Sequence, residues 1–303
     1  MLSVFGDCMK KGTKTSSFGV SQRANHDSTA FYNSKLYKKH KQKEVEFKET
    51  LLATDILDKI FLKSSENMKE LPDNSIHLMI TSPPYNVGKD YDQNLSLPEY
   101  LKLLKNVLKE THRVLVTGGR VAINVANVGR KPYIPLHSYI IKIMLDLGFS
   151  MRGEIIWNKS ASSGTSFAWG SWKSAANPVL RDIHEYILIF SKDSYSRKKD
   201  TRQDTITNQE FMDYTKSIWT FSSVSAKKIG HPAPFPEELP RRIIQLYSFK
   251  GDIVLDPFMG SGQTAIAALK SGRHFIGYEI DKNYQQLATN RVKEFINQGK
   301  LAN

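Results

Sequence analysis

The sequence predicts an α/β fold in which a mostly parallel β-sheet carries helices on both faces. From about residue 52, short runs rich in β-branched and aromatic residues alternate with stretches whose apolar residues recur every three or four positions. This alternation is typical of βαβ units, which cover both faces of a parallel sheet with helices. A chain of 303 residues with 40% hydrophobic composition can bury the core that such a sheet needs.

Seven strands and five helices are expected. The strands are Lys59–Leu62, Ile76–Thr81, Gly119–Val125, Met151–Trp157, His184–Phe190, Ile253–Asp256 and His274–Ile280. The helices are Leu97–Thr111, Pro135–Leu147, Pro236–Phe249, Gly262–Ser271 and Asp281–Asn297. Because no helical pattern separates the fourth strand from the fifth, these two are predicted to pair antiparallel at one edge of the sheet.

The remaining segments are more polar. Residues 1–50 are rich in Lys, Ser, Asn and His without a periodic apolar pattern, which predicts a flexible basic arm before a single domain over residues 51–303. The arm could follow DNA phosphates, although its composition favours a solvated tail without a specific role. Two polar stretches inside the domain, Asn158–Asp182 and Ser191–Lys216, are predicted to be loops, of a length that is usually functional or disordered.

Composition narrows the classes of function. Forty-three Lys and Arg against 30 Asp and Glu give a net charge of +13, which suits a nucleic-acid partner and, equally well, a generally basic solvated surface. The single cysteine, Cys8, excludes an intrachain disulfide and a cysteine-based zinc site, and its polar surroundings argue against a catalytic thiol. The sequence has no apolar run of about 20 residues and no signal-peptide pattern, so a cytoplasmic protein is expected.

The first chemical signal is the run Thr81-Ser82-Pro83-Pro84-Tyr85-Asn86 at the end of an apolar strand. Ligands of open α/β sheets bind outside the carboxyl ends of strands. Two prolines remove N–H donors, so neighbouring carbonyls can point into a cleft, and Tyr85 offers a flat face. This arrangement suits the amino group of a flipped-out base, with an aromatic ring stacked on that base. A simple Pro-Pro turn with a packed tyrosine explains the run at least as well when it is taken alone.

The second signal is a strand that runs into a glycine-rich turn and a helix, Ile253-Val254-Leu255-Asp256-Pro257-Phe258-Met259-Gly260-Ser261-Gly262. Glycines let the backbone approach a nucleotide-like ligand, and Glu279, at the end of the next strand, supplies a carboxylate for ribose hydroxyls. The pattern is also compatible with a dinucleotide fold, and a tight strand-to-helix connection remains the structural alternative. A third segment, His231-Pro232-Ala233-Pro234-Phe235-Pro236, forms a rigid approach to a helix, although His231 alone is more often structural.

Together these segments resemble the DNA amino-methyltransferases, in the permuted group whose catalytic motif precedes the cofactor motif. The resemblance covers about residues 55–297: TSPPY matches the catalytic motif, DPFMGSG the cofactor loop, GYEID the ribose-binding strand, and HPAPFPEEL the segment that closes over the cofactor's methionine part. Two departures are visible. Phe61–Ser65 lacks the Gly-Asp that many relatives carry, and Ala233 and Phe235 replace a Thr and a Lys.

The resemblance implies a Rossmann-like methyltransferase fold with a seven-stranded sheet, S-adenosylmethionine as cofactor, no metal, and duplex DNA as substrate. It implies catalytic roles for Ser82, Pro83, Pro84 and Tyr85 and cofactor contacts for Asp256, Pro257, Phe258, Gly260, Ser261, Gly262, Glu279, His231 and Pro232. It divides the domain into a catalytic half (51–157), DNA-recognition loops (about 158–230) and a cofactor-binding half (231–297). Serine at position 82 resembles the cytosine-N4 enzymes, with adenine N6 as the alternative target.

The resemblance also suggests a partner. It implies a restriction-modification system with a cognate restriction endonuclease, and the sequence leaves the oligomeric state open, a homodimer included.

DNA contacts are expected from polar and aromatic loop residues, and Val87–Asp92 has the composition of a lid over the target base. The candidates are Asn86, Lys89, Trp169, Trp172, Lys173, Arg197, Lys198, Lys199 and Arg202. Solvated surface residues and packed tryptophans are an equally good account of the last seven.

Two other classes of protein compete with the methyltransferase assignment. A nicotinamide-dependent dehydrogenase is disfavoured because its glycine motif would lie near the start of the fold, whereas here it lies near residue 260. A protein that only binds DNA is disfavoured because it would not need the intact Ser82–Tyr85 motif.

Overall fold

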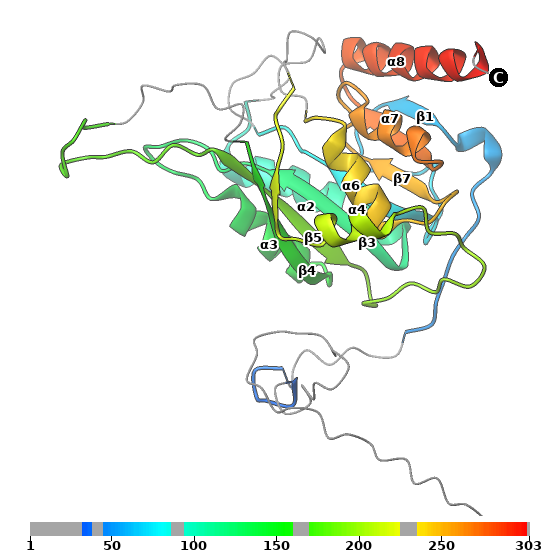
Figure 1. The fold of residues 1–303 in the computed structure, drawn as a ribbon, viewed down its shortest axis with the longest axis horizontal. Helices are drawn as coiled ribbons and strands as arrows, with labels where there is room; N and C mark the ends of the chain where they lie inside the picture. Colours follow the sequence, from blue (N-terminus) through cyan, green and yellow to red (C-terminus); the bar gives the residue numbers. More distant parts are fainter. Residues whose placement is uncertain (1–31, 38–44, 86–93, 160–169, 225–234, 302–303) are drawn as a thin grey trace, which may run out of the picture. The chain divides into compact units, whose positions relative to one another are not determined.

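The computed structural model describes residues 32–37, 45–85, 94–159, 170–224 and 235–301. The chain divides into two compact units, Met1–Glu44 and Val45–Asn303. In the first unit the described residues form a short turn, in which the rings of Tyr32 and Tyr37 pack edge to face with centroids 5.3 Å apart. The second unit contains the sheet and the helices that cover it (Figure 1).

The sheet has eight strands in the order β1-β8-β7-β2-β3-β5-β4-β6. They are β1 (Lys59–Leu62), β2 (Ile76–Thr81), β3 (Leu115–Val125), β4 (Ser150–Asn158), β5 (His184–Ser191), β6 (Ile218–Thr220), β7 (Ile253–Asp256) and β8 (His274–Glu279). Strand β5 runs antiparallel to its neighbours β3 and β4, and every other pairing is parallel. The predicted mostly parallel sheet and its antiparallel β4–β5 pair are confirmed.

The eighth strand, β6, is an addition to the seven predicted. It pairs in parallel with β4 over Ile156–Asn158, so the antiparallel pair lies one strand inside the sheet edge. The sequence missed β6 because three residues are too few to show a period-two pattern.

Six α-helices are present among the described residues of the second unit. They are α2 (Leu97–Val114), α3 (Leu136–Asp146), α4 (Asn208–Tyr214), α6 (Glu238–Tyr247), α7 (Gln263–Lys270) and α8 (Lys282–Leu301). Five were predicted. The sixth, α4, lies in the stretch that was predicted to be a polar loop. Its sequence signal is a capping box, in which Thr207 accepts a hydrogen bond from the backbone of Glu210 while the Glu210 side chain accepts one from Thr207.

Helices cover both faces of the sheet. Side chains point to both faces of each strand, and the apolar ones on each face pack against helices. In β2, Ile76 and Met79 pack into the cluster formed with α2 and α3, whereas Leu78 and Ile80 pack into the cluster formed with α4, α6, α7 and α8. All six residues of β2 are therefore buried, as expected for a central strand of a parallel sheet.

The strand order places a ligand-binding crevice between β7 and β2. The connection β7–α7–β8 proceeds toward one side of the sheet and β2–α2–β3 toward the other, so the strand order reverses between β7 and β2. Ligands of open α/β sheets bind at such a point, outside the carboxyl ends of the strands. We call the edge where the parallel strands end the carboxyl edge and the opposite edge the amino edge.

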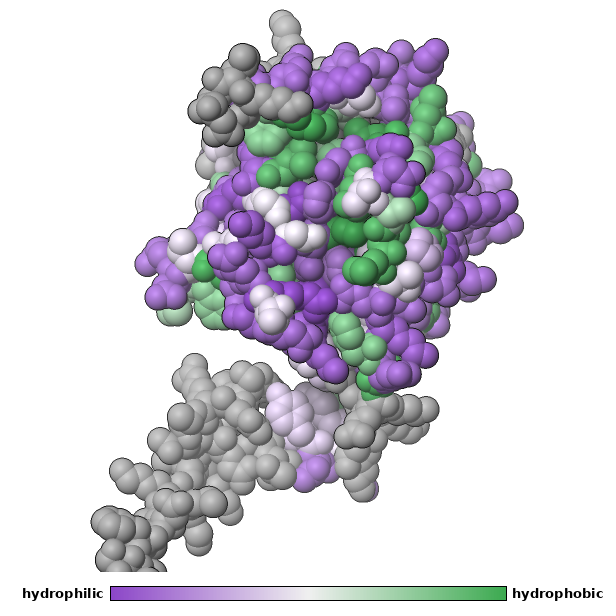
Figure 2. Space-filling model, turned by 90° about the vertical axis from the view of Figure 1, so that its right-hand side faces the viewer, coloured by the Kyte–Doolittle hydropathy of each residue, from purple (hydrophilic) through white to green (hydrophobic). Residues whose placement is uncertain are grey.

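The surface is mostly polar. On the face shown in Figure 2, hydrophilic residues make up most of the surface, and hydrophobic residues gather in patches between them. Among the described residues, no helix is long and apolar enough to cross a membrane.

Candidate functional site at the carboxyl edge

The two glycine- and proline-rich motifs meet at the crevice between β7 and β2. The run Ser82–Tyr85 follows β2, and the run Pro257–Gly262 follows β7. A hydrogen bond of 2.7 Å from Thr81 Oγ1 to Asp256 Oδ1 joins the two strand ends across 175 residues of sequence. The fold therefore brings the predicted catalytic and cofactor motifs together at the edge where α/β proteins bind ligands.

Asp256 is buried at this junction and accepts hydrogen bonds from both motifs. Its side chain is 1% exposed and also accepts hydrogen bonds from Thr264 Oγ1 (2.6 Å) and the backbone N–H of Phe258 (3.1 Å). Burial raises the pKa of its carboxyl to about 6. Asp256 was predicted to contact the cofactor. Because its oxygens are occupied by protein donors, the structure makes it a positioning residue for both motifs.

The loop after β7 forms a backbone cradle beside the carboxylate of Glu279. Gly260 and Gly262 adopt φ angles of +51° and +81°, a region that favours glycine. A Cβ on Gly262 would lie 3.0 Å from Cβ of Ala288, so the close approach of α8 also requires glycine. Glu279 accepts a hydrogen bond of 2.8 Å from the N–H of Gly260, and burial raises the pKa of its carboxyl.

The segment after β1 packs against the same loop. Ser65 is buried and donates a hydrogen bond of 2.9 Å to the carbonyl of Pro257. The missing Gly-Asp in Phe61–Ser65 therefore does not remove this segment from the site.

Around Tyr85, five polar side chains from four segments of the chain form one network. The Ser82 and Tyr85 hydroxyls are 3.1 Å apart, and the Tyr85 hydroxyl donates to Glu185 Oε2 at 3.1 Å. Glu185 also accepts hydrogen bonds of 2.5 Å from Asn124 Nδ2 and from Lys159 Nζ. Burial, followed by the charge of Glu185, raises the pKa of Tyr85 well above its usual value, so this hydroxyl keeps its proton.

Three members of this network, Asn124, Lys159 and Glu185, were missed from the sequence. Asn124 had a signal, since it is a lone polar residue inside the apolar run at the end of β3. Its Oδ1 atom is buried and has no partner among the described residues. Glu185 and Lys159 had no signal, because only the antiparallel pairing of β5 with β4 and β3 brings them to Tyr85.

Several predicted site residues lie outside the described parts of the chain. They are His231, Pro232, Asn86, Lys89 and Trp169, together with the lid prediction over Val87–Asp92. Their roles remain predictions.

Two exposed tips extend beyond the carboxyl edge, in the green segments past β3, β4 and β5 in Figure 1. The first tip, residues 128–134, is closed by paired backbone hydrogen bonds between Val128 and Ile134 and carries Arg130, Lys131 and Tyr133. The second tip, residues 170–178, is closed by a bridge between Gly170 and Pro178 and carries the predicted Trp172 and Lys173. An ion pair of 3.0 Å between Arg130 and Asp182 ties the first tip to the segment between the second tip and β5.

The predicted DNA contacts Arg197, Lys199 and Arg202 are located elsewhere. Arg197 is paired with Asp252 at 2.5 Å, with side chains only 5% and 4% exposed, at the amino edge. Lys199 pairs with Asp204, and Arg202 pairs with Glu49. These cations are neutralised and lie at the edge opposite Ser82, so we exclude them from the DNA interface proposed below. Lys198 is exposed beside them, with its ammonium 5.9 Å from the ring centre of Phe47.

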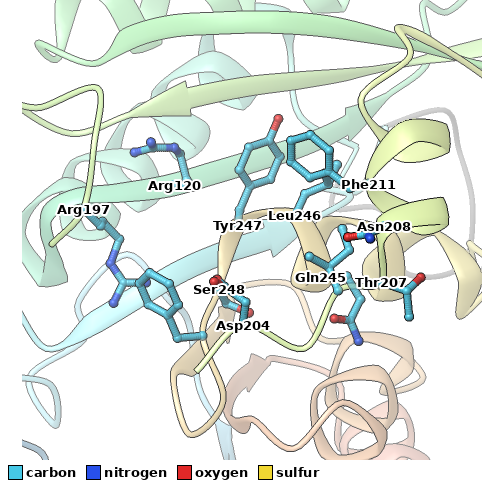
Figure 3. Close-up of a pocket in the computed structure, with 12 residues that line it drawn as sticks. Arg120, Arg197, Asp204, Thr207, Asn208, Phe211, Gln245, Leu246, Tyr247 and Ser248 are labelled. Atoms are coloured by element: carbon cyan, nitrogen blue, oxygen red, sulfur yellow. The ribbon is translucent and has the colours of Figure 1, made fainter. Parts of the chain in front are cut away.

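A cavity of about 480 Å³ occurs at the same amino edge and is separate from the motif junction. Arg120, Arg197 and Tyr247 contribute to its wall, and Figure 3 shows Phe211 and Tyr247 among the side chains that line it. Burial, together with the nearby guanidinium of Arg152, lowers the pKa of Arg120 to about 10.

Comparisons with known proteins show which family the chain resembles. Residues 76–290 match the family model described as DNA methylase. The chain is 34% identical over 281 residues to the type II methyltransferase M.MthZI of Methanothermobacter thermautotrophicus, covering 81% of this chain and 78% of that one. It is 31% identical over 297 residues to the type II methyltransferase M.MjaI of Methanocaldococcus jannaschii, covering 80% and 97%.

A solved structure is similar as well. TTHA0409 of Thermus thermophilus, named as a DNA modification methylase and complexed with S-adenosyl-L-methionine, superposes with a TM-score of 0.63 at 30% identity, covering 78% of this chain and 95% of that one.

Proposed function

The chain belongs to the DNA methylase family of N6 and N4 amino-methyltransferases, and we propose that its target is N4 of cytosine. The proposed methyl donor is S-adenosyl-L-methionine. The observation that carries the proposal is the junction of Ser82–Tyr85 with Gly260–Gly262 through Thr81 and Asp256. A base-gripping motif and a nucleoside cradle then lie side by side, as direct methyl transfer between two bound molecules requires.

The residues around the cradle fit a nucleoside-like cofactor. The positive φ angles of Gly260 and Gly262 shape the backbone cradle, and Glu279 provides a carboxylate for ribose hydroxyls. Phe258 is half-buried beside the loop and offers a ring to a flat group. When bound, S-adenosyl-L-methionine supplies a methyl group that is already activated on a sulfonium, so the protein contributes mainly position.

On the other side of the junction, Ser82, Pro83 and Tyr85 receive the base. The Ser82 hydroxyl and the Pro83 carbonyl accept the amine's N–H bonds, and the Tyr85 ring stacks on the base. Holding the amine in this way keeps its lone pair directed toward the methyl donor. Serine at position 82 favours cytosine N4, and adenine N6 is the second candidate target. The catalytic motif precedes the cofactor motif in the chain, which supports assignment to the permuted group.

Duplex DNA would contact the two tips that extend beyond the carboxyl edge. Lys131 and Lys173 carry positive charge there, and Tyr133 and Trp172 are 44% and 65% exposed. Cations attract phosphates and exposed aromatic rings stack on bases, so this combination suits nucleic acid. The first tip was not predicted from the sequence and adds Lys131 and Tyr133 to the candidates, whereas its Arg130 is paired with Asp182.

The biological role we propose is modification within a restriction-modification system in the cytoplasm, with a cognate endonuclease as partner. The names of the type II relatives support it. We also retain the proposed division of the domain into a catalytic half (51–157), DNA-recognition loops (about 158–230) and a cofactor-binding half (231–297).

The roles of the two motifs are tested by separating turnover from cofactor binding. Ser82→Ala and Tyr85→Ala should each lower turnover at least about 100-fold and leave S-adenosyl-L-methionine affinity, measured by calorimetry, nearly unchanged. Glu279→Ala should instead weaken cofactor affinity. Tyr139→Ala, at an exposed position of α3, is the matched control and should change neither quantity. Near-normal turnover in both Ser82→Ala and Tyr85→Ala would contradict the proposed site.

A further inference from the structure

The hydroxyl of Ser82 is the first member of a hydrogen-bonded chain that ends on a carboxylate from another strand. Ser82 Oγ lies 3.1 Å from the Tyr85 hydroxyl, which lies 3.1 Å from Glu185 Oε2. Glu185 is the second residue of β5, the antiparallel strand, and does not belong to the proline motif. The ammonium of Lys159 lies 2.5 Å from its other oxygen, so a cation faces this carboxylate.

The directions of these hydrogen bonds follow from proton counting. An ionised carboxylate carries no proton, so Tyr85 must donate its single hydroxyl proton to Glu185. The raised pKa of Tyr85 means that this proton stays on its oxygen. In the bond between Ser82 and Tyr85, the donor must therefore be Ser82. With its only proton directed at Tyr85, the Ser82 oxygen accepts a hydrogen bond of 3.4 Å from Asn124 Nδ2 with one lone pair and keeps the other for a further donor.

We propose that Glu185 is the positioning residue that fixes Ser82 as a hydrogen-bond acceptor for the target amine, and that it receives the proton which the amine releases. The proposal rests on the proposed function, because it assigns a partner to Ser82 in the same site. It also favours the exocyclic amine, a donor, over a ring nitrogen acceptor as the group that Ser82 contacts.

The proton balance of the reaction is simple along this chain. When the amine nitrogen bonds to the methyl carbon, the electron pair of the carbon–sulfur bond remains on sulfur. The nitrogen then carries a positive charge and must release one proton. That proton passes to Ser82, the Ser82 proton passes to Tyr85, and the Tyr85 proton passes to Glu185. The products are a neutral methylated amine and a neutral Glu185 carboxyl group, which loses its proton to solvent before the next turnover.

Glu185→Gln tests the proposal because it keeps the shape and inverts the hydrogen-bond direction. The Gln amide can donate to Tyr85, which turns the Tyr85 proton toward Ser82 and the Ser82 proton toward the base. We expect turnover to fall about 100-fold, the size of a general-base contribution, while the KM for DNA and the cofactor affinity change little. Glu185→Asp, which keeps the charge, should recover part of the lost turnover.

A binding measurement without cofactor separates this role from a merely structural one. Wild-type protein should bind a duplex that contains the target base about tenfold more tightly than one in which that base lacks its exocyclic amine. Glu185→Gln should lose this preference and bind both duplexes alike. The matched control is Glu154→Gln on the adjacent strand β4, which should keep both turnover and preference.

The outcomes distinguish this inference from the function on which it rests. Absence of methyl transfer by the wild-type protein would overturn the proposed function. Transfer by the wild type together with near-normal turnover and an intact amine preference in Glu185→Gln would overturn the inference alone. If Glu185→Gln unfolds, Tyr85→Phe breaks the same chain without a change of charge and should lose the amine preference; a retained preference in that variant would refute the role of Glu185.

Discussion

Asp256 links the two halves of the site, and its ionisation should be visible in the stability of the protein. Its folded-state pKa is raised from 3.8 to about 6, mainly by burial. The folded state thus binds this proton more tightly than the unfolded state does, so stability falls as pH rises from about 4 to about 6. A rise of roughly two units in this pKa corresponds to a change of about 3 kcal/mol in the free energy of unfolding.

The variant Asp256→Asn isolates this contribution because the amide does not titrate. We expect the free energy of unfolding of the wild type, minus that of the variant, to decrease by about 3 kcal/mol between about pH 4 and about pH 7. Urea unfolding at a series of pH values, with linear extrapolation to water, measures it, and groups common to both proteins cancel in the difference. A difference that stays constant within about 0.5 kcal/mol across this range would refute the buried, ionisable junction.

Three further variants probe the rest of the fold. Arg197→Gln removes the guanidinium that pairs with the buried Asp252 and leaves that carboxylate a hydrogen bond from the Phe249 N–H, so it should cost about 3 kcal/mol in urea unfolding. An altered salt dependence of DNA binding in anisotropy titrations would restore Arg197 to the DNA interface. Gly262→Ala places a Cβ at a φ of +81° and 3.0 Å from Ala288; it should cost at least about 1–2 kcal/mol and weaken cofactor binding, and unchanged calorimetric affinity would argue against the cradle. A hydrogen bond from His77 is the main cause that lowers the pKa of Glu49 to about 2. Glu49 therefore stabilises the fold above about pH 4.5 and loses this contribution as the pH falls toward about 2. Glu49→Gln should therefore cost about 3 kcal/mol at neutral pH and almost nothing near about pH 2, whereas an equal cost at both would contradict the assignment.

The sequence predicted those parts of the fold that repeat a local pattern. Strands such as Ile76–Thr81 are continuous apolar runs because both of their faces are buried, and helices such as α2 show apolar residues at helical spacing. The two site motifs were equally visible, because Pro83 and Pro84 in one and Gly260 and Gly262 in the other are required by the local backbone. These features depend on neighbours in the chain.

The sequence could not reveal contacts that depend on strand order. Glu185 reaches Tyr85 only because β5 is inserted antiparallel between β3 and β4. The ion pair of Arg197 has the same origin, since its basic stretch looks like a DNA-binding loop until the fold places Asp252 beside it. The hydrogen bonds of Asp256 could not be predicted either, because a carboxylate beside a glycine loop gives no indication of whether it faces a ligand or the neighbouring strand.

The most direct test of the central claim is to identify the methylated base. The purified protein would be incubated with methyl-labelled S-adenosyl-L-methionine and mixed-sequence duplex DNA, and the DNA digested to nucleosides for mass spectrometry. We predict label on N4-methylcytosine. Label on N6-methyladenine would contradict the choice of base and leave the amine chemistry intact, and transfer to neither amine would contradict the account of the site.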